Sequence, residues 1–346
     1  MSSLGKIIVI KLGTSSITSD TGVIETHTLE RVAADISYLH KQGHKIILVS
    51  SGAVGNGRGF LKNYKGRLMD RKAAAAVGNP ILINKYSQAF SVYEIIIAQT
   101  LLERWHFAER KHFLQLRETI ETLWENNIIP IANENDVVSD LEIKFSDNDH
   151  LATLLAAGFN ADVLLIGSSV EGILDNKGEV ISRIDDVGAV VKEFVRDDKS
   201  ALGLGGMTTK VSYATLASNL GIEATIFGLQ TDKPIIGALE GRLGTYFPPK
   251  AINPSARHMW LASGSLANGS LEVDEGAKNA LLERKSLLHV GINAIVNPFQ
   301  AGEIIDIKYS GQSIAVGIAK VASSDIDLQS KEIGLLVVHA NNLVII

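Results

Sequence analysis

The sequence predicts an α/β sandwich with a mainly parallel central sheet, followed by a smaller domain of short strands. Three observations predict this. Up to about residue 250, short apolar runs alternate with stretches of helical spacing. The runs are rich in Ile, Val and Leu and nearly free of polar residues, which is typical of parallel strands buried on both faces. After Pro248-Pro249 the apolar runs become shorter and are separated by Gly, Asn and Ser.

The predicted strands of the first domain are five apolar runs, at residues 6–11, 45–50, 128–132, 161–167 and 224–227. Between them, the spacing predicts helices over residues 27–42, 114–126 and 150–158. Helix ends are expected at Gly43, Gly158 and Gly221, because glycine readily takes the left-handed conformation that closes a helix.

The second domain is predicted over residues 257–346, and the first over residues 1–250. The proline pair and the change in composition place the boundary near residue 250. Within the second domain, residues 303–309 and 312–318 flank Ser310-Gly311, which predicts a β-hairpin with a two-residue turn.

Length and composition narrow the class of protein. The 346 residues amount to roughly two domains, and 46% hydrophobic with 21% charged residues is the balance of a soluble globular protein. No apolar run approaches the roughly 18–20 residues that cross a bilayer, and the apolar residues 7–10 are too few for a signal peptide. Cysteine is absent, which excludes disulfides, thiolate zinc sites and cysteine nucleophiles. We expect a cytoplasmic protein without a membrane partner.

Ligands of open parallel sheets bind beyond the carboxyl ends of the strands, and four polar segments of this chain are candidates for that position. The first, residues 11–16, reads Lys-Leu-Gly-Thr-Ser-Ser. Gly13 permits a tight turn whose backbone N–H groups suit phosphate oxygens, with Lys11 as a point charge. Taken alone, this segment is better explained as a solvated turn.

Two further segments are rich in small residues. Residues 50–55 read Ser-Ser-Gly-Ala-Val-Gly and suit either the close approach of a ligand or a plain strand–turn–helix elbow. Residues 203–210 read Gly-Leu-Gly-Gly-Met-Thr-Thr-Lys and open a predicted helix that runs to Leu220, an arrangement suited to nucleotide phosphates. A glycine-rich loop alone is weak evidence, since a flexible loop has the same composition.

The most informative segment is acidic. Asn133-Glu134-Asn135-Asp136 follows a predicted buried strand, and six acids against one lysine fall within residues 132–149. A solvated acidic loop is the usual explanation of such a run. Here the position at the binding edge of the sheet, and the amides among the acids, favour recognition of an amino group. No Ser-His-Asp triad or metal-binding histidine pattern stands out, so we predict no metal ligands.

Taken together, these segments resemble the glutamate 5-kinase family, enzymes of the amino-acid-kinase fold that begin proline synthesis. The matching residues, in family order, are Lys11-Leu12-Gly13-Thr14-Ser15, Ser51-Gly52-Ala53, 73–78, Asn133-Glu134-Asn135-Asp136, 142–145, Asp147-Asn148-Asp149 and Gly205-Gly206-Met207-Thr208-Thr209-Lys210. Residues 273–288 and 339–344 are similar to the C-terminal PUA domain of many bacterial members. The resemblance implies an amino-acid-kinase-like three-layer sandwich plus a small, mostly-β PUA-like domain.

The activity implied by the resemblance is phosphoryl transfer from ATP, with Mg²⁺, to the γ-carboxylate of L-glutamate, giving L-glutamyl 5-phosphate. The residues that would hold the amino acid are Ser51, Asp136 and Asn148, with Asn133 and Asp147 nearby. Lys11 and Lys210 would stabilise charge on the transferring phosphoryl group, and Asp149 would orient both lysines. A carboxylate nucleophile is ionised at neutral pH, so alignment and cationic stabilisation suffice without a general base.

The nucleotide site implied by the resemblance consists of Gly13, Ser168, Ser169, Leu204, Gly205, Gly206, Met207, Thr208, Thr209 and Lys210. Family members usually carry Thr-Asp where this chain has Ser168-Ser169, and many have threonine where it has Leu204. The serine keeps a hydroxyl donor but lacks the carboxylate, and the leucine removes a hydroxyl near phosphate. A catalytically weakened relative with a binding or regulatory role therefore stays an alternative.

A kinase of another small amino acid or carboxylate, such as aspartate or N-acetylglutamate, is the nearest rival among enzymes. Acetylation would remove the ammonium charge that the acidic segment suits, which ranks that substrate lower. The resemblance also implies a homo-oligomer, either a dimer or a tetramer. It further implies feedback inhibition by proline, which shares the ammonium and carboxylate groups of glutamate.

RNA binding is a third alternative, raised by the PUA-like tail. The whole chain has a net charge of −5, from 33 Lys and Arg against 38 Asp and Glu. Residues 257–346 hold seven basic and nine acidic residues. Because RNA binding depends on phosphate contacts, this balance disfavours RNA as a partner and favours a packing or regulatory module.

Overall fold

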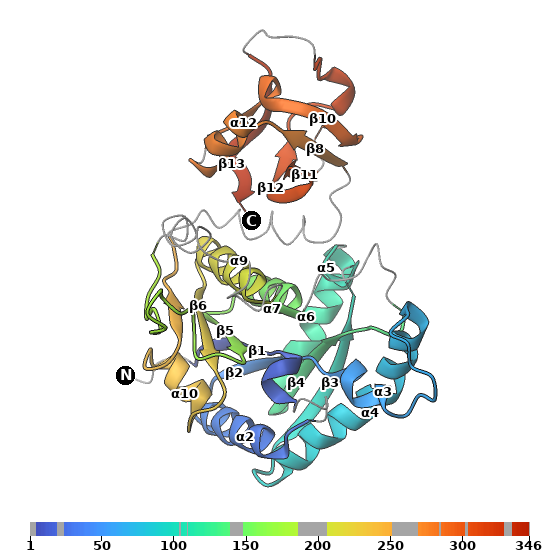
Figure 1. Ribbon diagram of the computed structural model, residues 1–346, viewed down its shortest axis with the longest axis vertical. Helices are drawn as coiled ribbons and strands as arrows, with labels where there is room; N and C mark the ends of the chain where they lie inside the picture. Colours follow the sequence, from blue (N-terminus) through green and yellow to red (C-terminus); the bar gives the residue numbers. More distant parts are fainter. Residues whose placement is uncertain are drawn as a thin grey trace. The chain divides into compact units, whose positions relative to one another are not determined.

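The computed structural model describes residues 5–18, 24–103, 105–108, 110–138, 148–185, 206–250, 269–283, 285–301, 304–328 and 334–345. The chain divides into two compact units, Met1–Glu103 with Gln115–Lys250 and Arg104–Leu114 with Ala251–Ile346. Each unit has its own sheet (Figure 1). Within the described ranges, no helix is long and apolar enough to cross a membrane.

The first unit is built on a mainly parallel sheet, which confirms the predicted fold class. Among the described residues its seven strands run in the order β3-β4-β2-β1-β5-β6-β7, and the edge strand β7 pairs antiparallel with β6. The strands are β1 (Ile7–Leu12), β2 (Lys45–Ser50), β3 (Ile96–Leu102), β4 (Ile128–Glu134), β5 (Val163–Ser168), β6 (Glu223–Gly228) and β7 (Thr245–Phe247). The five predicted strands are all present, with ends shifted by up to two residues.

Strand β1 is the switch point of the sheet. It pairs in parallel with β2 on one side and with β5 on the other, so that Lys11 stands beside Val49 and Ile166. The chain therefore leaves β1 toward one half of the sheet and returns later to the other half. Crevices beyond the carboxyl end of such a strand are the usual ligand sites of parallel sheets.

Helices cover both faces of this sheet (Figure 1). On one face α2 packs on α4 and on α10, and on the other α7 packs on α9 and lies across β1, β2, β4 and β5. The helices of this unit and of its borders are α1 (Thr14–Ile17), α2 (Thr26–Lys41), α3 (Ala53–Arg58), α4 (Leu68–Ser91), α5 (Trp105–Ala108), α6 (Arg110–Glu125), α7 (Asn148–Gly158), α9 (Gly206–Asn219) and α10 (Pro234–Leu239).

The core explains why these helices form where they do. Leu29, Val32 and Ile36 recur along one face of α2 and are buried against alternate residues of β1, such as Ile8 and Ile10. Burial of both sheet faces accounts for the unbroken apolar strands.

The second unit is mostly β-structure. Its described strands form one sheet in the order β10-β8-β11-β12-β13-β9. The elements are β8 (Gly269–Val273), α12 (Glu275–Leu282), β9 (Leu287–Leu288), β10 (Ile292–Asn297), β11 (Ile304–Tyr309), β12 (Gln312–Ala319) and β13 (Leu336–Ile345). The predicted hairpin is confirmed: β11 and β12 pair antiparallel around Ser310 and Gly311, whose φ angles of 50° and 76° are those of a type I′ turn.

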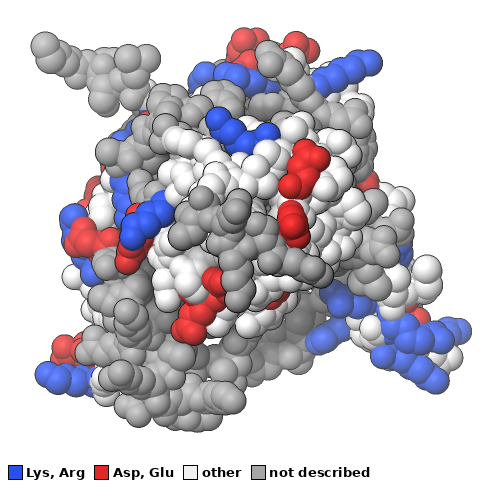
Figure 2. All heavy atoms as spheres, turned by 90° about the horizontal axis from the view of Figure 1, so that it is seen from above, with Lys and Arg blue, Asp and Glu red and all other residues white. Residues whose placement is uncertain are grey.

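Charged side chains of both signs share the surface. Figure 2 shows Lys and Arg beside Asp and Glu over the face in view, with basic side chains gathered at one edge. From the last residue of α3 to the first turns of α4, residues 58–72 carry six basic residues and a single acid, Asp70. Asp70 forms an ion pair with Arg67 at 3.0 Å.

Candidate active site

Lys11 is a buried charge at the carboxyl end of the central strand. The residue is 4% exposed, and its Nζ lies 2.6 Å from Oδ1 of Asp149. Gly13 leaves room for this ammonium group, because a Cβ there would stand 3.3 Å from Nζ of Lys11. A charge buried to this degree requires an opposite charge beside it.

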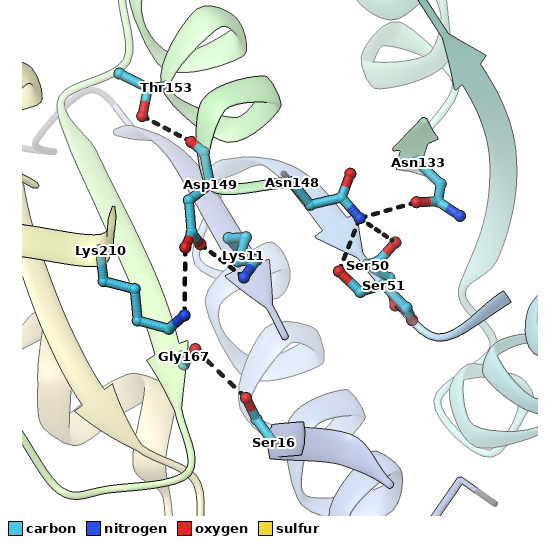
Figure 3. Close-up of polar contacts among 10 residues, drawn as sticks. All are labelled: Lys11, Ser16, Ser50, Ser51, Asn133, Asn148, Asp149, Thr153, Gly167 and Lys210. Carbon is cyan, nitrogen blue, oxygen red and sulfur yellow. Dashed lines mark hydrogen bonds and ion pairs between the residues drawn. The ribbon is translucent and has the colours of Figure 1, made fainter. Parts of the chain in front are cut away.

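The other carboxylate oxygen of Asp149 forms an ion pair with a second lysine (Figure 3). Lys210, in the first turns of α9, donates from Nζ to Oδ2 of Asp149 at 3.2 Å. Asp149 is 1% exposed and lies in the first turn of α7, where the helix dipole favours a carboxylate. The "lysine clamp" (Lys11, Asp149 and Lys210) thus holds two cations around one anion.

A second cluster of polar side chains lies beside the lysine clamp. Nδ2 of Asn148 donates to Oγ of Ser51 at 2.7 Å, to Oδ1 of Asn133 at 2.9 Å and to the backbone oxygen of Ser50 at 3.3 Å (Figure 3). Asn133, in turn, donates from Nδ2 to Oδ1 of Asn79 at 3.3 Å. We call Ser51, Asn148, Asn133 and Asn79 the "amide row". Its side chains come from α4, α7 and the ends of β2 and β4.

The end of β2 is fixed by a buried hydroxyl pair. Ser50 and Tyr86 share a hydrogen bond of 2.8 Å, and both residues are fully buried. Burial raises the pKa of the Tyr86 phenol well above its ordinary value, so the hydroxyl stays protonated at neutral pH. Tyr86 belongs to α4 and therefore ties this helix to the strand that carries Ser51.

Helices α3 and α4 cross with their backbones in contact. A Cβ on Gly78 would lie 1.8 Å from the backbone oxygen of Ala53, and a Cβ on Gly57 would lie 1.8 Å from that of Ala74. Only glycine fits at either position. The contact sets α4 against the turn after Ser51, where Gly52 takes φ 108°.

A pocket of ≈ 280 Å³ lies beyond the carboxyl ends of β5 and β6. Its lining residues are Glu171, Val180, Ser182, Gly228, Thr231, Arg242, Leu243 and Gly244. Within the described part of the chain, the buried Oγ1 of Thr231 has no hydrogen-bond partner. Carboxylate, hydroxyl and guanidinium groups around one cavity suit a polar ligand.

The predicted site residues fall into four groups. The structure brings Lys11, Asp149 and Lys210 together in one cluster, and Ser51, Asn133 and Asn148 in the neighbouring one. Gly13 follows β1, Ser168 is the last residue of β5 and Ser169 follows it. Asp136 lies half-buried in the turn after β4. The first residues of α9 are Gly206, Met207, Thr208 and Thr209. Asp147, Leu204 and Gly205 lie outside the described residues. The roles assigned to these residues stay predictions.

Two residues of the site escape prediction from the sequence. Asn79 and Tyr86 lie on α4, which the apolar spacing does not identify as a helix. A buried asparagine among alanines is the available signal for Asn79, but Pro80 directly after it suggests a turn instead.

Comparison with protein families identifies both units. Residues 6–228 match the amino acid kinase family, and residues 269–339 match the PUA domain. The first match covers the described lysine clamp and the amide row.

Individual proteins agree with these matches. The chain is 36% identical over 326 residues to "Glutamate 5-kinase" of Kosmotoga olearia, covering 92% of this chain and 89% of that protein. It is 32% identical over 370 residues to "Glutamate 5-kinase" of Aliivibrio salmonicida, covering 100% of both. Among solved structures, carbamate kinase from Giardia lamblia bound to AMP-PNP is similar with a TM-score of 0.54 and 22% identity, covering 72% of this chain and 100% of that one. This last similarity concerns the fold alone.

Proposed function

The chain belongs to the glutamate 5-kinase family of amino acid kinases, and on that premise we propose that it phosphorylates the γ-carboxylate of L-glutamate with ATP. The product is L-glutamyl 5-phosphate, and the reaction is the first step of proline biosynthesis. The observation that carries the proposal is the lysine clamp, in which the buried ammonium group of Lys11 and the partly buried one of Lys210 meet beside a row of amides. The two clusters suit the two reactants: a phosphoryl group and an amino acid.

The chemical step requires alignment and positive charge. A γ-carboxylate oxygen attacks the γ-phosphorus, a new O–P bond forms, and the bond from phosphorus to the β–γ bridging oxygen breaks, leaving ADP. The carboxylate is already ionised at neutral pH, so the step takes no proton from the acceptor. Lys11 and Lys210 stabilise the negative charge on the equatorial and leaving oxygens, and Asp149 fixes both ammonium groups in place.

The amino acid occupies the amide row. Ser51, Asn133 and Asn148 supply a hydroxyl and two amides, and Asp136 supplies a carboxylate for the ammonium group, with Asp147 nearby. An acidic and amide-rich surface selects a free amino acid over an N-acetylated one, because acetylation removes the ammonium charge.

The nucleotide enters as Mg²⁺-ATP. Its phosphates are bound by Gly13, by Ser168-Ser169 and by the segment 204–210, of which the described residues 206–210 begin α9. The pocket beyond β5 and β6 receives the nucleoside, for which Thr231 offers an unpaired buried hydroxyl among the described residues.

Trapping of the acyl phosphate tests this function. Purified protein is incubated with L-glutamate, Mg²⁺-ATP and hydroxylamine, and hydroxamate and ADP are measured. We expect both products, in equal amounts and only when both substrates are present. Absence of product at saturating Mg²⁺-ATP overturns the proposal. Replacement of glutamate by aspartate or N-acetylglutamate tests the rival acceptors, which should yield little product.

A second candidate is a weakened relative that binds without catalysis, favoured by Ser169 and Leu204 at the nucleotide site. Titration calorimetry separates the two functions. Glutamate binding without binding of any nucleoside triphosphate supports the weakened relative.

Further properties follow from the same family membership. We propose that residues 1–250 form the kinase domain and residues 257–346 the PUA domain, that the protein is a cytoplasmic homo-oligomer, and that proline inhibits it at the glutamate site. The acidic balance of residues 257–346 argues for a packing or regulatory role of the PUA domain rather than RNA binding.

A further inference from the structure

Asn79 ends the amide row on the side away from the lysines. Figure 3 shows Asn133 on the side of Asn148 opposite to Asp149 and the lysines, with Nδ2 of Asn133 turned away from Asn148. That Nδ2 is the atom that donates to Asn79. The residue is 5% exposed, and its Oδ1 accepts from Nδ2 of Asn133. Its own Nδ2 is buried and has no hydrogen-bond partner within the described residues.

Asn148, on the other side of Asn133, has the opposite deficiency. Its Nδ2 donates to three oxygens, whereas its Oδ1 is buried without a partner among the described residues. Buried amide atoms without a partner are rare and unfavourable in folded proteins. Here one donor and one acceptor are left over in the same row.

The position of Asn79 is set by the backbone rather than by its own side chain. Its neighbour Gly78 packs closely against Ala53, because a Cβ at Gly78 would lie 1.8 Å from the backbone oxygen of Ala53. This contact keeps α4 from sliding along α3. Its other neighbour, Pro80, has a fixed φ. The contact between the two helices therefore fixes the backbone at Asn79 relative to the start of α3 and to Ser51.

A spare donor and a spare acceptor match the two charged groups of an α-amino acid. A carboxylate only accepts hydrogen bonds, and an ammonium group only donates them. Nδ2 of Asn79 therefore suits a carboxylate oxygen, and Oδ1 of Asn148 suits the ammonium group. The carboxylate that reacts must lie near Lys11 and Lys210, so the one at Asn79 is the α-carboxylate.

We propose that Asn79 is a specificity-determining residue that donates a hydrogen bond from Nδ2 to the α-carboxylate of the amino acid. This inference rests on the proposed function, because it takes glutamate as the acceptor. The contact is made equally in the ground state and in the transition state, since the α-carboxylate does not change charge during the reaction. Loss of the contact therefore raises KM and leaves kcat nearly unchanged.

The test compares L-glutamate with isoglutamine, in which the α-carboxylate is a neutral carboxamide. Asn79→Asp keeps the oxygen that accepts from Asn133 and replaces the NH₂ donor by an oxygen. That oxygen repels an α-carboxylate and accepts from a carboxamide N–H. We expect kcat/KM for glutamate to fall about 10- to 100-fold, mainly through KM. We also expect the preference for glutamate over isoglutamine to fall at least about tenfold.

Controls separate recognition from a structural effect. Ser37→Ala is the matched control, because Oγ of Ser37 is likewise buried without a partner among the described residues but lies on α2, which contributes no side chain to the amide row. It should leave the ratio of the two substrates unchanged. An equal loss for both substrates in the Asn79→Asp protein would mean a structural role and overturns the inference. If that variant fails to fold, Asn79→Ser carries the test and must raise the glutamate KM about tenfold at constant kcat.

The wild-type protein reports separately on the proposed function. If it phosphorylates glutamate and the Asn79 variants keep its substrate preference and KM, the inference alone fails. If the wild type neither binds nor phosphorylates glutamate, the proposed function fails and the inference fails with it.

Discussion

Lys11 and Lys210 are joined through one carboxylate, because their ammonium groups bind the two separate oxygens of Asp149 at 2.6 and 3.2 Å. One lysine comes from the central strand of the sheet and the other from α9, so a long stretch of chain separates them. Two ammonium groups on one carboxylate repel each other, and the negative charge between them offsets that repulsion. Asp149 supplies that negative charge, and the fold can therefore hold both lysines at the carboxyl edge of the sheet.

Removal of one lysine should affect turnover more than binding. We expect Lys210→Ala to lower kcat about 10²- to 10³-fold and to change the glutamate KM little, because the ammonium charge matters chiefly as charge develops in the transition state. Steady-state kinetics measure both constants. Lys177→Ala, at an exposed turn, is the matched control and should behave as the wild type. A parallel loss of glutamate affinity would contradict the assigned role.

Neutralisation of Asp149 should destabilise the fold itself. We expect Asp149→Asn to lower the free energy of unfolding by about 3–5 kcal/mol, because the buried ammonium group of Lys11 and the partly buried one of Lys210 lose their common partner. Urea denaturation measures this change. Asp185→Asn removes an acid from an exposed ion pair with Arg183 and should have little effect. Equal stability of the two variants would show that Asp149 does not hold the lysines together.

Asp136 should act on the amino acid and not on the phosphoryl group. We expect Asp136→Ala to raise the glutamate KM about tenfold or more at nearly constant kcat, since a lost carboxylate weakens binding of the ammonium group in both states. Initial rates over a range of glutamate concentrations test this. A fall in kcat at unchanged KM is the result that rejects the role.

The crossing of α3 and α4 should tolerate no side chain. A Cβ on Gly78 would lie 1.8 Å from a backbone oxygen, so Gly78→Ala must push the helices apart. We expect a loss of about 1–3 kcal/mol in the free energy of unfolding, together with a raised glutamate KM. Gly59→Ala is the control, because a Cβ at Gly59 meets nothing within 4 Å. Thermal unfolding and kinetics of the two variants provide the comparison.

Asp35 should make stability depend on pH. Its Oδ2 accepts from the backbone N–H groups of Ile235 and Ile236 at 2.9 and 3.2 Å, yet burial raises the pKa of this carboxyl above its ordinary 3.8. Between 3.8 and the raised pKa, the folded chain binds more protons than the unfolded chain. The contribution of Asp35 to the free energy of unfolding therefore falls as pH rises through this window.

Asp35→Asn removes that titration. We expect the stability of this variant relative to the wild type to increase between about pH 4 and pH 7. Urea denaturation at several pH values in this range measures the difference. A difference that stays constant or shrinks as pH rises would show that the carboxyl is not desolvated in the folded protein.

The parts of the fold that are buried on both sides could be predicted from the sequence. Strands β1, β2 and β5 are unbroken apolar runs because each has neighbours on both edges and helices on both faces. The edge strand β3 could not be predicted in the same way, since it is only partly buried and contains Gln99 and Thr100. Helix α4 contains Gly78 and Pro80, two residues that normally interrupt a helix, and tertiary packing overrides that local preference.

The candidate site could be predicted only where it follows the strands. Lys11, Ser51 and Asn133 stand at carboxyl ends of parallel strands, which a sequence reveals as polar residues after apolar runs. Asp149 and Lys210 belong to helix starts. The sequence places them in an acidic and in a glycine-rich segment, but only the family resemblance indicated their roles. Asn79 had no such signal, because the backbone contact that brings α4 to the site is a property of the fold and not of the residues around Asn79.

Asn148 and Asp149 are consecutive residues, and one side chain holds the amides while the other holds the lysines. A single peptide bond in the first turn of α7 thus sets the spacing between the amide row, where the amino acid binds, and the lysine clamp, where the phosphoryl group is transferred. No hinge stands between them, so a tilt of this turn misaligns both partners at once. An engineer who wishes to change the acceptor while keeping phosphoryl transfer should therefore redesign from the α4 side and leave this dipeptide untouched.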